Sequence, residues 1–312
     1  MEMAKKAPGK HYRKGVTITQ LIALFPDSEA AEEWFIQQRW PNGVHCPKCN
    51  SDNIQERASR KPQRFRCRTC RKDFSTKTGT LMQGSNLNYQ KWAIAIYLMT
   101  TGIKGVSSMR LHRELGITQK SAWFMEHRIR ETWEDNSPLF RGPVEVDETY
   151  VGGKERNKHA SKKLRAGRGT VGKTAIVGAK DRASNRVAAK VVERTDAATL
   201  QRFVVDRTDW QAEVFTDSAS AYKGLPKHQA VAHSVGEYVR GQVHTNGVES
   251  FWALLKRGYH GTFHHFSKKH LRRYVNEFAG RHNLRECDTM AQMNITAARM
   301  QGRRLRYKDL IA

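Results

Sequence analysis

Four of the five cysteines in this chain form two Cys-x-x-Cys pairs, Cys46 with Cys49 and Cys67 with Cys70, separated by seventeen residues. At this spacing two knuckle turns bring four thiolates around one tetrahedral Zn²⁺. Disulfides are not expected, because the chain shows no export signal. Four protein ligands leave no coordination position open, so the pattern predicts one structural zinc in a small ribbon over residues 44–78.

Positive charge surrounds the second cysteine pair and extends along the whole chain. Lys and Arg number 55 against 30 Asp and Glu, which gives a formal net charge of +25. Such a field favours a polyanion, usually nucleic acid, although a basic soluble protein or a membrane-surface protein has the same composition. We expect double-stranded DNA as the partner, with Arg64, Arg66 and Arg68 of the ribbon on its phosphates.

Hydrophobic content and its distribution exclude two other classes of protein. The chain is 38% hydrophobic, with seven Trp and twelve Phe, which is enough to build two or three packed domains. It contains no run of about 18 apolar residues and does not open with the pattern of a signal peptide. We therefore expect a cytoplasmic, multidomain protein without a membrane partner.

Helical patterns flank the cysteine region. Residues 1–43 predict a loose basic arm followed by two helices, the second capped by Asp27. Residues 86–135 predict a DNA-binding segment in which the link at Gly116 and the N-cap Thr118 make two helices resemble a helix-turn-helix. A plain helical bundle gives the same pattern. The three helices expected in this segment are 88–101, 107–115 and 118–133.

Beyond residue 143 strands alternate with helices, which predicts an α/β domain with a mixed sheet. A loop over 154–173 holds eight Lys or Arg and one Glu. It is either a solvated loop or a phosphate contact through Lys162, Lys163 and Arg165. The expected strands are 144–151, 174–180, 186–192, 213–215 and 230–235, with helices over 197–207 and from about 246.

Three carboxylates from distant segments could meet in this domain. Asp147 lies inside an apolar strand, where an unpaired carboxylate is costly; alternation places it on the face of Glu145 and opposite Glu148. Taken alone, Asp147 is better explained as a strand-edge acid paired with a nearby Lys or Arg. Asp217 follows a buried strand, where ligands gather in α/β sheets, or else caps the next turn.

The third carboxylate lies on the helix that opens near residue 246. Asn246, Glu249 and Lys256 share one face of this helix, and apolar residues line the other. A surface face of salt bridges has the same spacing. Phosphodiester chemistry by two metal ions needs acids from distant parts of the chain, and Asp147, Asp217 and Glu249 provide such a set.

In this order the segments resemble the DDE transposases of bacterial insertion sequences, in the branch with an N-terminal zinc ribbon and an ISXO-type transposase domain. The resemblance covers nearly all of residues 20–285. Its matching stretches are the ribbon from Cys46 to Phe74, VEVDETYVGG from Val144, VFTDSASAY around Asp217, and HTNGVESFWALLKRGYHGTFHHFSKKHLRRYVNEFAGRHN from His244 to Asn283.

The resemblance implies a multidomain protein with a ribonuclease H-like catalytic domain over 143–285 and a basic tail over 286–312. In that domain Asp147, Asp217 and Glu249 would hold two Mg²⁺ (or Mn²⁺) ions, with Asn246 as a supporting or substituting ligand. The implied DNA contacts near the terminal nucleotides are Lys256 and its neighbour Arg257.

The implied activity is cleavage of the 3′ strand at the ends of a mobile element and transfer of that strand to target DNA. Two ends must be brought together, so a homo-oligomer, at least a dimer on DNA, is expected in the bacterial nucleoid. The alternatives are a metal-dependent DNA nuclease, which would hydrolyse without joining, and a zinc-ribbon DNA-binding regulator, which would need no converging carboxylates.

Overall fold

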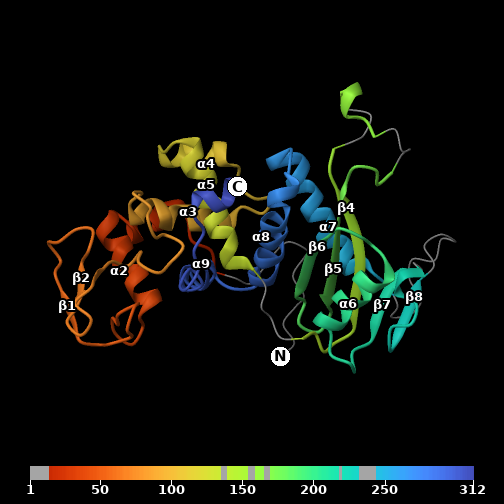
Figure 1. The fold of residues 1–312 in the computed structure, drawn as a ribbon, viewed down its shortest axis with the longest axis horizontal. Helices are drawn as coiled ribbons and strands as arrows, with labels where there is room; N and C mark the ends of the chain where they lie inside the picture. Colours follow the sequence, from red (N-terminus) through yellow and green to blue (C-terminus); the bar gives the residue numbers. More distant parts are fainter. Residues whose placement is uncertain (1–13, 135–138, 154–158, 165–168, 218–219, 232–243) are drawn as a thin grey trace. The chain divides into compact units, whose positions relative to one another are not determined.

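The computed structural model describes residues 14–134, 139–153, 159–164, 169–217, 220–231 and 244–312 (Figure 1). The chain divides into two compact units. One comprises Met1–Thr132 with Leu284–Ala312, and the other comprises Trp133–Asn283. Among the helices of the described residues, none is both long and apolar enough to cross a membrane.

The first unit is organised around α2 (Ser28–Arg39), α3 (Tyr89–Thr101) and α9 (Thr289–Ala298), which contact one another although α9 comes from the far end of the chain (Figure 1). Trp34 links α2 to α9, because its indole N–H donates to the side-chain oxygen of Asn294 in α9 at 2.9 Å. Residues 286–312, expected as a basic tail, therefore include a helix that packs on α2 and α3.

Side-chain caps start the first two helices, and the cap of the second, at Asp27, is the one that the sequence predicts. Thr17 opens α1 (Ile18–Leu24) with a capping box, and Asp27 opens α2 by accepting from the backbone N–H groups of Glu29 and Ala30. Residues 1–13, which hold most of the predicted arm, lie outside the described residues.

The cysteine region is a three-stranded antiparallel sheet in the order β1 (Ile54–Glu56), β2 (Phe65–Cys67) and β3 (Asp73–Phe74). Its core consists of little more than Trp40, Phe65 and Phe74 with two of the cysteines. So small a core needs a metal to hold it.

Two helices joined by a tight turn follow α3. They are α4 (Ser108–Leu115) and α5 (Gln119–Arg130), and they contact each other. Gly116 ends α4 with a φ of 57°, in the left-handed region that favours glycine, and the Thr118 hydroxyl caps α5. The remaining elements of this unit are the 3-10 turn Glu131–Trp133 at its border and α10 (Tyr307–Ile311).

The second unit contains a five-stranded sheet in the order β6-β5-β4-β7-β8. The first three strands in this order are antiparallel, and β4, β7 and β8 run parallel. The mixed sheet predicted from the sequence is thus confirmed. Its strands are β4 (Val144–Val151), β5 (Thr174–Asp181), β6 (Val187–Val192), β7 (Val214–Asp217) and β8 (His228–Val231).

Apolar cores lie on both faces of this sheet. On one face Val144 and Val146 pack with Leu200 of α6 (Ala197–Arg207). The other face is covered by α7 (Asn246–Gly258) and α8 (Leu271–Leu284). Short helical turns complete the unit: Ala160–Lys162, Ser220–Tyr222, Tyr259–Phe263 (a π-helix) and Lys268–His270.

Most element boundaries agree with the sequence patterns to within two residues. The helix expected over 118–133 ends at Arg130 and continues as a 3-10 turn. The last strand begins at His228 rather than at 230, and residues 232–243 lie outside the described residues. Parts of the charged loop, 154–158 and 165–168, also lie outside them.

Candidate functional site

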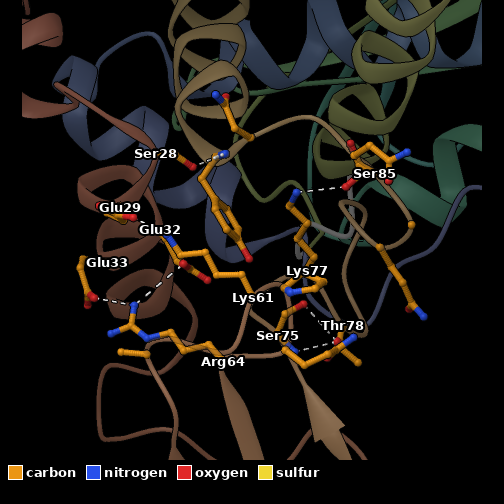
Figure 2. A pocket seen from close by; sticks show the side chains of 18 of the residues that line it. Ser28, Glu29, Glu32, Glu33, Lys61, Arg64, Ser75, Lys77, Thr78 and Ser85 are labelled. Atoms are coloured by element: carbon orange, nitrogen blue, oxygen red, sulfur yellow. Dashed lines mark hydrogen bonds and ion pairs between the residues drawn. The ribbon is translucent and has the colours of Figure 1, made fainter.

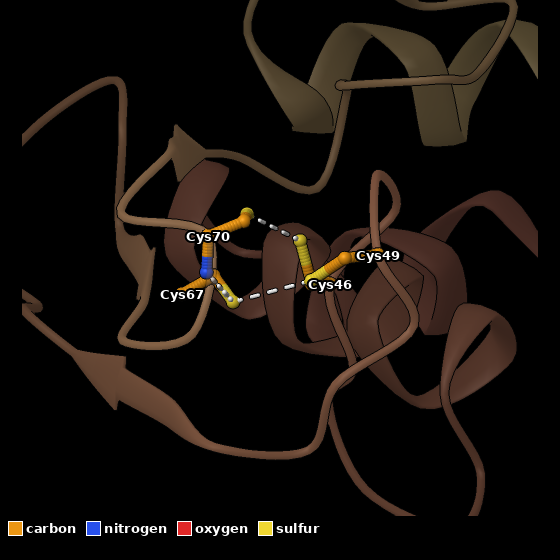
Figure 3. A group of neighbouring side chains, drawn as sticks. All are labelled: Cys46, Cys49, Cys67 and Cys70. Carbon is orange, nitrogen blue, oxygen red and sulfur yellow. Dashed lines mark hydrogen bonds between the residues drawn. The ribbon is translucent and has the colours of Figure 1, made fainter.

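The four predicted zinc ligands form one cluster (Figure 3). Their sulfur atoms all lie within 4.8 Å of one another, and both the Cys46–Cys70 and the Cys49–Cys67 pairs stand at 3.6 Å. Thiolates bound tetrahedrally at about 2.3 Å from a zinc ion would lie about 3.8 Å apart. The donor set therefore fits a structural Zn²⁺, as the spacing predicts.

Backbone amides prepare these thiols for metal binding. The N–H of Lys48 points to the sulfur of Cys46 at 3.5 Å, and the N–H of Cys70 points to that of Cys67 at 3.4 Å. The Cys70 amide is the largest cause that lowers the pKa of Cys67 to about 6. A thiolate is the form that binds a metal, so this geometry favours the ligating state.

The ribbon arginines expected on DNA are largely engaged within the ribbon. Arg64 makes ion pairs with Glu33 at 2.6 Å and with Glu56. Arg66 lies 3.3 Å from Asp73. Of the three predicted arginines only Arg68 is exposed.

The three predicted acids lie on one face of the sheet of the second unit. β4 pairs with β7 in parallel, with Val144 opposite Val214, and the same register continued places Asp147 opposite Asp217. Glu249 is in the first turn of α7, the helix that covers this face. The charges of Asp217 and Glu249 both raise the pKa of Asp147.

The acid cluster is more widely spaced than the cysteine cluster. In the described part of the chain, the four cysteines form the one group of three or more potential ligands whose donor atoms all lie within 4.8 Å of one another. Asp147, Asp217 and Glu249 are neighbours without reaching that spacing.

Asp147 lies under an aromatic cover. Gly178 of β5 pairs with Asp147, and a Cβ at Gly178 would stand 2.5 Å from the ring of Trp252 on α7. The indole thus rests on the sheet beside the carboxylate. Burial is the largest cause that raises the pKa of Asp147 to about 6; the charges of Asp217 and Glu249 add to it, and the backbone N–H of Glu148 opposes it.

Glu148 points to the opposite face, as the strand alternation predicts. Its pKa is raised to about 7, first by burial and then by the charges of Asp147 and Asp217, while the polar Tyr222 side chain acts against the rise. Tyr222 is fully buried. The sequence patterns gave neither residue a role. A second acid adjoining Asp147 in an apolar strand was the available signal.

Glu145 ties α7 to the central strand, a role that the sequence patterns did not show. This buried carboxylate accepts from the backbone N–H of Val248 at 2.9 Å and from Arg182 at 2.7 Å. A Cβ at Gly247 would stand 2.7 Å from the same carboxylate, so glycine is needed there for close approach. Val248, whose N–H group Glu145 binds, directly precedes Glu249 in α7.

The first turn of α7 also orients Glu249 directly. The hydroxyl of Thr245 donates to the carboxylate of Glu249 at 2.8 Å. Asn246, Glu249 and Lys256 are all exposed on α7, in agreement with the predicted polar face. On the other side of the helix Val248, Phe251 and Leu255 are buried.

The other predicted DNA contacts lie at the surface or outside the described residues. Arg257 is exposed beside Lys256. Lys163 is exposed at the end of the turn Ala160–Lys162, which includes the backbone of Lys162. Arg165 lies outside the described residues.

Comparisons with known proteins agree with this arrangement. Residues 140–283 match the model of the ISXO2-like transposase domain, and residues 26–73 match that of the transposase zinc-ribbon domain. The chain is also similar to an uncharacterized protein in transposable element ISH50 of Halobacterium salinarum. The two are 31% identical over 251 residues, which cover 76% of this chain and 84% of the relative. The chain therefore belongs to the family of insertion-sequence transposases that join a transposase zinc ribbon to an ISXO2-like transposase domain.

Proposed function

We propose that this transposase cleaves the 3′ strand at the ends of its element and joins that strand to target DNA, with Asp147, Asp217 and Glu249 holding two Mg²⁺ or Mn²⁺ ions. One observation carries the proposal. In a member of a transposase family, acids from a central strand, a neighbouring strand end and a covering helix are placed on one face of a mixed sheet. A ribonuclease H-like fold requires such a sheet with helices on both faces, as found here.

The donor set suits magnesium, which prefers carboxylate oxygen. When bound, two such ions supply activation of the attacking oxygen and stabilisation of the leaving oxygen.

The residues of the chain position the acids, and Asp147 binds and releases a proton. The carboxyl group of Asp147 holds a proton up to a pH of about 6 and must release it before it can bind a cation. Trp252 excludes water from one side of it. Glu145 holds the first turn of α7 in place, and thereby the Glu249 carboxylate that Thr245 orients. Preorganisation of this kind lowers the cost of reaching the reactive geometry.

Glu249 is the favoured third ligand, and Asn246 a supporting or substituting one. Both are exposed on the same face of α7. Glu249 carries the charge that acts on Asp147. A carboxylate binds Mg²⁺ more strongly than a neutral amide does, because it adds a full negative charge.

DNA would approach along the exposed cations that the family resemblance singles out. Lys256 lies two turns beyond Glu249 on α7, with Arg257 next to it. We place the charged turn with Lys162, Lys163 and Arg165 on phosphates as well. In the first unit, α4 and α5 would act as a helix-turn-helix, of which the exposed start of α5 reads the groove. Pairing of two element ends requires at least a dimer.

A strand-joining assay tests the proposal. The full-length protein is incubated with Mg²⁺ and duplexes that carry the element's ends, and cleaved and joined products are separated. Asp147→Asn, Asp217→Asn and Glu249→Gln should each abolish both products and leave binding of the ends intact. Glu193→Gln, at an exposed acid of the same unit, is the matched control and should keep full activity.

The alternatives predict other results. A nuclease would cleave without joining, and a regulator would bind without cleaving. Full joining by Asp147→Asn or Asp217→Asn would contradict the metal mechanism. Normal joining by Glu249→Gln together with an inactive Asn246→Ala would move the third ligand one turn back along α7.

A further inference from the structure

A cavity of about 660 Å³ lies beside the first cysteine knuckle in the first unit. Four segments form its walls: the end of α2, the knuckle itself, the turn at Gly79 and the stretch after α9. The last two are stitched together, because the N–H of Gly302 donates to the carbonyl oxygen of Gly79 at 3.0 Å. Both residues are glycines with positive φ angles, 73° and 67°, so neither projects a side chain into the cavity.

Apart from the zinc-binding thiols Cys46 and Cys49, the charged side chains that line this cavity are all cationic. Among the described residues that line it, none carries a carboxylate. Four cationic side chains line it, together with the imidazole of His45. The cations are Arg39, Lys48, Arg303 and Arg304.

A second cavity in the same unit provides the contrast (Figure 2). Its volume is about 870 Å³, and three glutamates line it together with its cations. Figure 2 shows Arg64 directed at Glu33, at 2.6 Å, and Lys61 forms an ion pair with Glu29. Lys61 and Arg64 are thus each paired with a carboxylate, whereas Arg304 lines both cavities. The described residues that line the cavity beside the first knuckle include no carboxylate, and Arg303 there donates to the backbone carbonyl oxygen of Glu131.

Arg39 shows the imbalance most directly. Its side chain is 9% exposed, and it donates to the carbonyl oxygen of Thr76 at 2.7 Å while its plane rests over Trp40. Its Nε has no hydrogen-bond partner among the described residues. Burial lowers the pKa of Arg39 to about 10. A nearby anion would relieve this cost.

Like charges also crowd the outer wall. Arg304 is exposed, and its charge adds to the burial that lowers the pKa of Arg128. The zinc site offsets part of the positive charge, since four thiolates around Zn²⁺ carry a net negative charge. The positive charge that is left is accessible from solvent at Lys48 and Arg304, which are both exposed.

We propose that this cavity receives the sugar–phosphate backbone of DNA, so that the ribbon holds DNA through its first knuckle and the stretch after α9. Arg64 and Arg66, which are paired with carboxylates, contribute less. The inference rests on the proposed function, which makes DNA the polyanion that the protein meets. Phosphate contacts of this kind position a protein on DNA without reading its sequence.

Binding of the full-length, zinc-loaded protein to fluorescent duplex DNA tests the inference. Lys48→Ala, Arg304→Ala and the double variant are compared with the wild type over a range of salt concentrations. Each lost phosphate contact lowers the slope of log affinity against log salt by about 0.9. Each single variant should therefore lose roughly five- to tenfold in affinity at about 0.1 M salt, equally for two unrelated sequences. Lys61→Ala is the matched control, because Lys61 lines the second cavity and is paired there with Glu29; this variant should bind as the wild type does.

Zinc content and melting temperature are measured on every variant. Wild-type slopes in Lys48→Ala, Arg304→Ala and the double variant would overturn the inference, and so would a loss of affinity that follows a loss of zinc. If the wild type binds DNA with a steep salt dependence that these variants leave unchanged, the inference alone fails. If the wild type does not bind DNA at all, the proposed function fails with it.

Discussion

Asp147→Asn should stabilise the protein in the absence of magnesium, although it removes a proposed metal ligand. The Asp147 carboxylate is covered by Trp252 and lies near two further negative charges, from Asp217 and Glu249. Without cations these charges repel one another around the half-buried Asp147. An asparagine keeps the volume of the side chain and removes one of the charges.

The size of the effect follows from the pKa of Asp147, which is raised from an ordinary 3.8 to about 6. One unit of pKa is worth about 1.4 kcal/mol, so the charged form costs about 3 kcal/mol at neutral pH. In a domain of this size 1 kcal/mol changes the melting temperature by about 2–4 °C. The variant should therefore melt roughly 6–12 °C above the metal-free wild type at pH 7.5.

The pH dependence has a definite sign. Because the folded protein holds the proton of Asp147 more tightly than the unfolded chain does, the free energy of unfolding of the wild type falls as the pH rises from about 4 to about 6. Glu148, whose pKa is raised to about 7, extends this fall. The advantage of Asp147→Asn should thus vanish near pH 4 and reach its full size above pH 6.

Thermal unfolding followed by circular dichroism, in buffer without divalent ions other than the bound zinc, measures the difference. Added Mg²⁺ should raise the melting temperature of the wild type and leave that of the variant unchanged. Asp196→Asn is the control of opposite sign: the N–H of Thr199 lowers the pKa of Asp196, so its charged form stabilises the fold above that pKa. An Asp147→Asn protein that melts below the wild type at pH 7.5 would refute this reasoning.

Three further results are expected. Removal of zinc by a strong chelator, or Cys67→Ser, should unfold the ribbon, because its core is so small; loss of bound zinc and of ribbon signals in an NMR spectrum would show it, and an unchanged spectrum would contradict it. Gly178→Ala should cost about 1–3 kcal/mol in a denaturant titration, since the new Cβ meets the Trp252 ring at 2.5 Å; Gly153→Ala, with open space around it, serves as the control, and equal stability of the two would be evidence against the close contact. Glu145→Gln should cost about 3–5 kcal/mol and reduce strand joining, because it leaves the guanidinium of Arg182 without its carboxylate; wild-type stability would show that the anchor is dispensable.

Local patterns in the sequence predicted much of this fold because their causes are local. The caps at Asp27 and Thr118 fix the starts of α2 and α5, and alternation along β4 fixes the faces of Asp147 and Glu148. The cysteine spacing led to the four-thiol cluster in the same way. Each of these features depends on residues within a turn or a strand of one another, or on a metal that gathers them.

Contacts between distant segments could not be predicted by these means. Glu145 anchors α7 through an amide 103 residues away, and nothing near Glu145 in the sequence indicates that partner. The same holds for Arg64, which pairs with Glu33 of the preceding helix. A basic segment such as 286–312 gives no sign that its helix packs on α2 and α3.

The first unit is discontinuous, and this has a consequence for how the protein is made. Residues 133–283 are inserted into it, so both ends of the second unit join the same body. On a ribosome the core that α9 completes must wait until the entire second unit has emerged. The Arg303 and Arg304 side of the cationic cavity is assembled at that moment. A nascent chain therefore cannot present the whole cavity before its acid-bearing unit has been synthesised, so the DNA contact proposed for this cavity would follow synthesis of that unit.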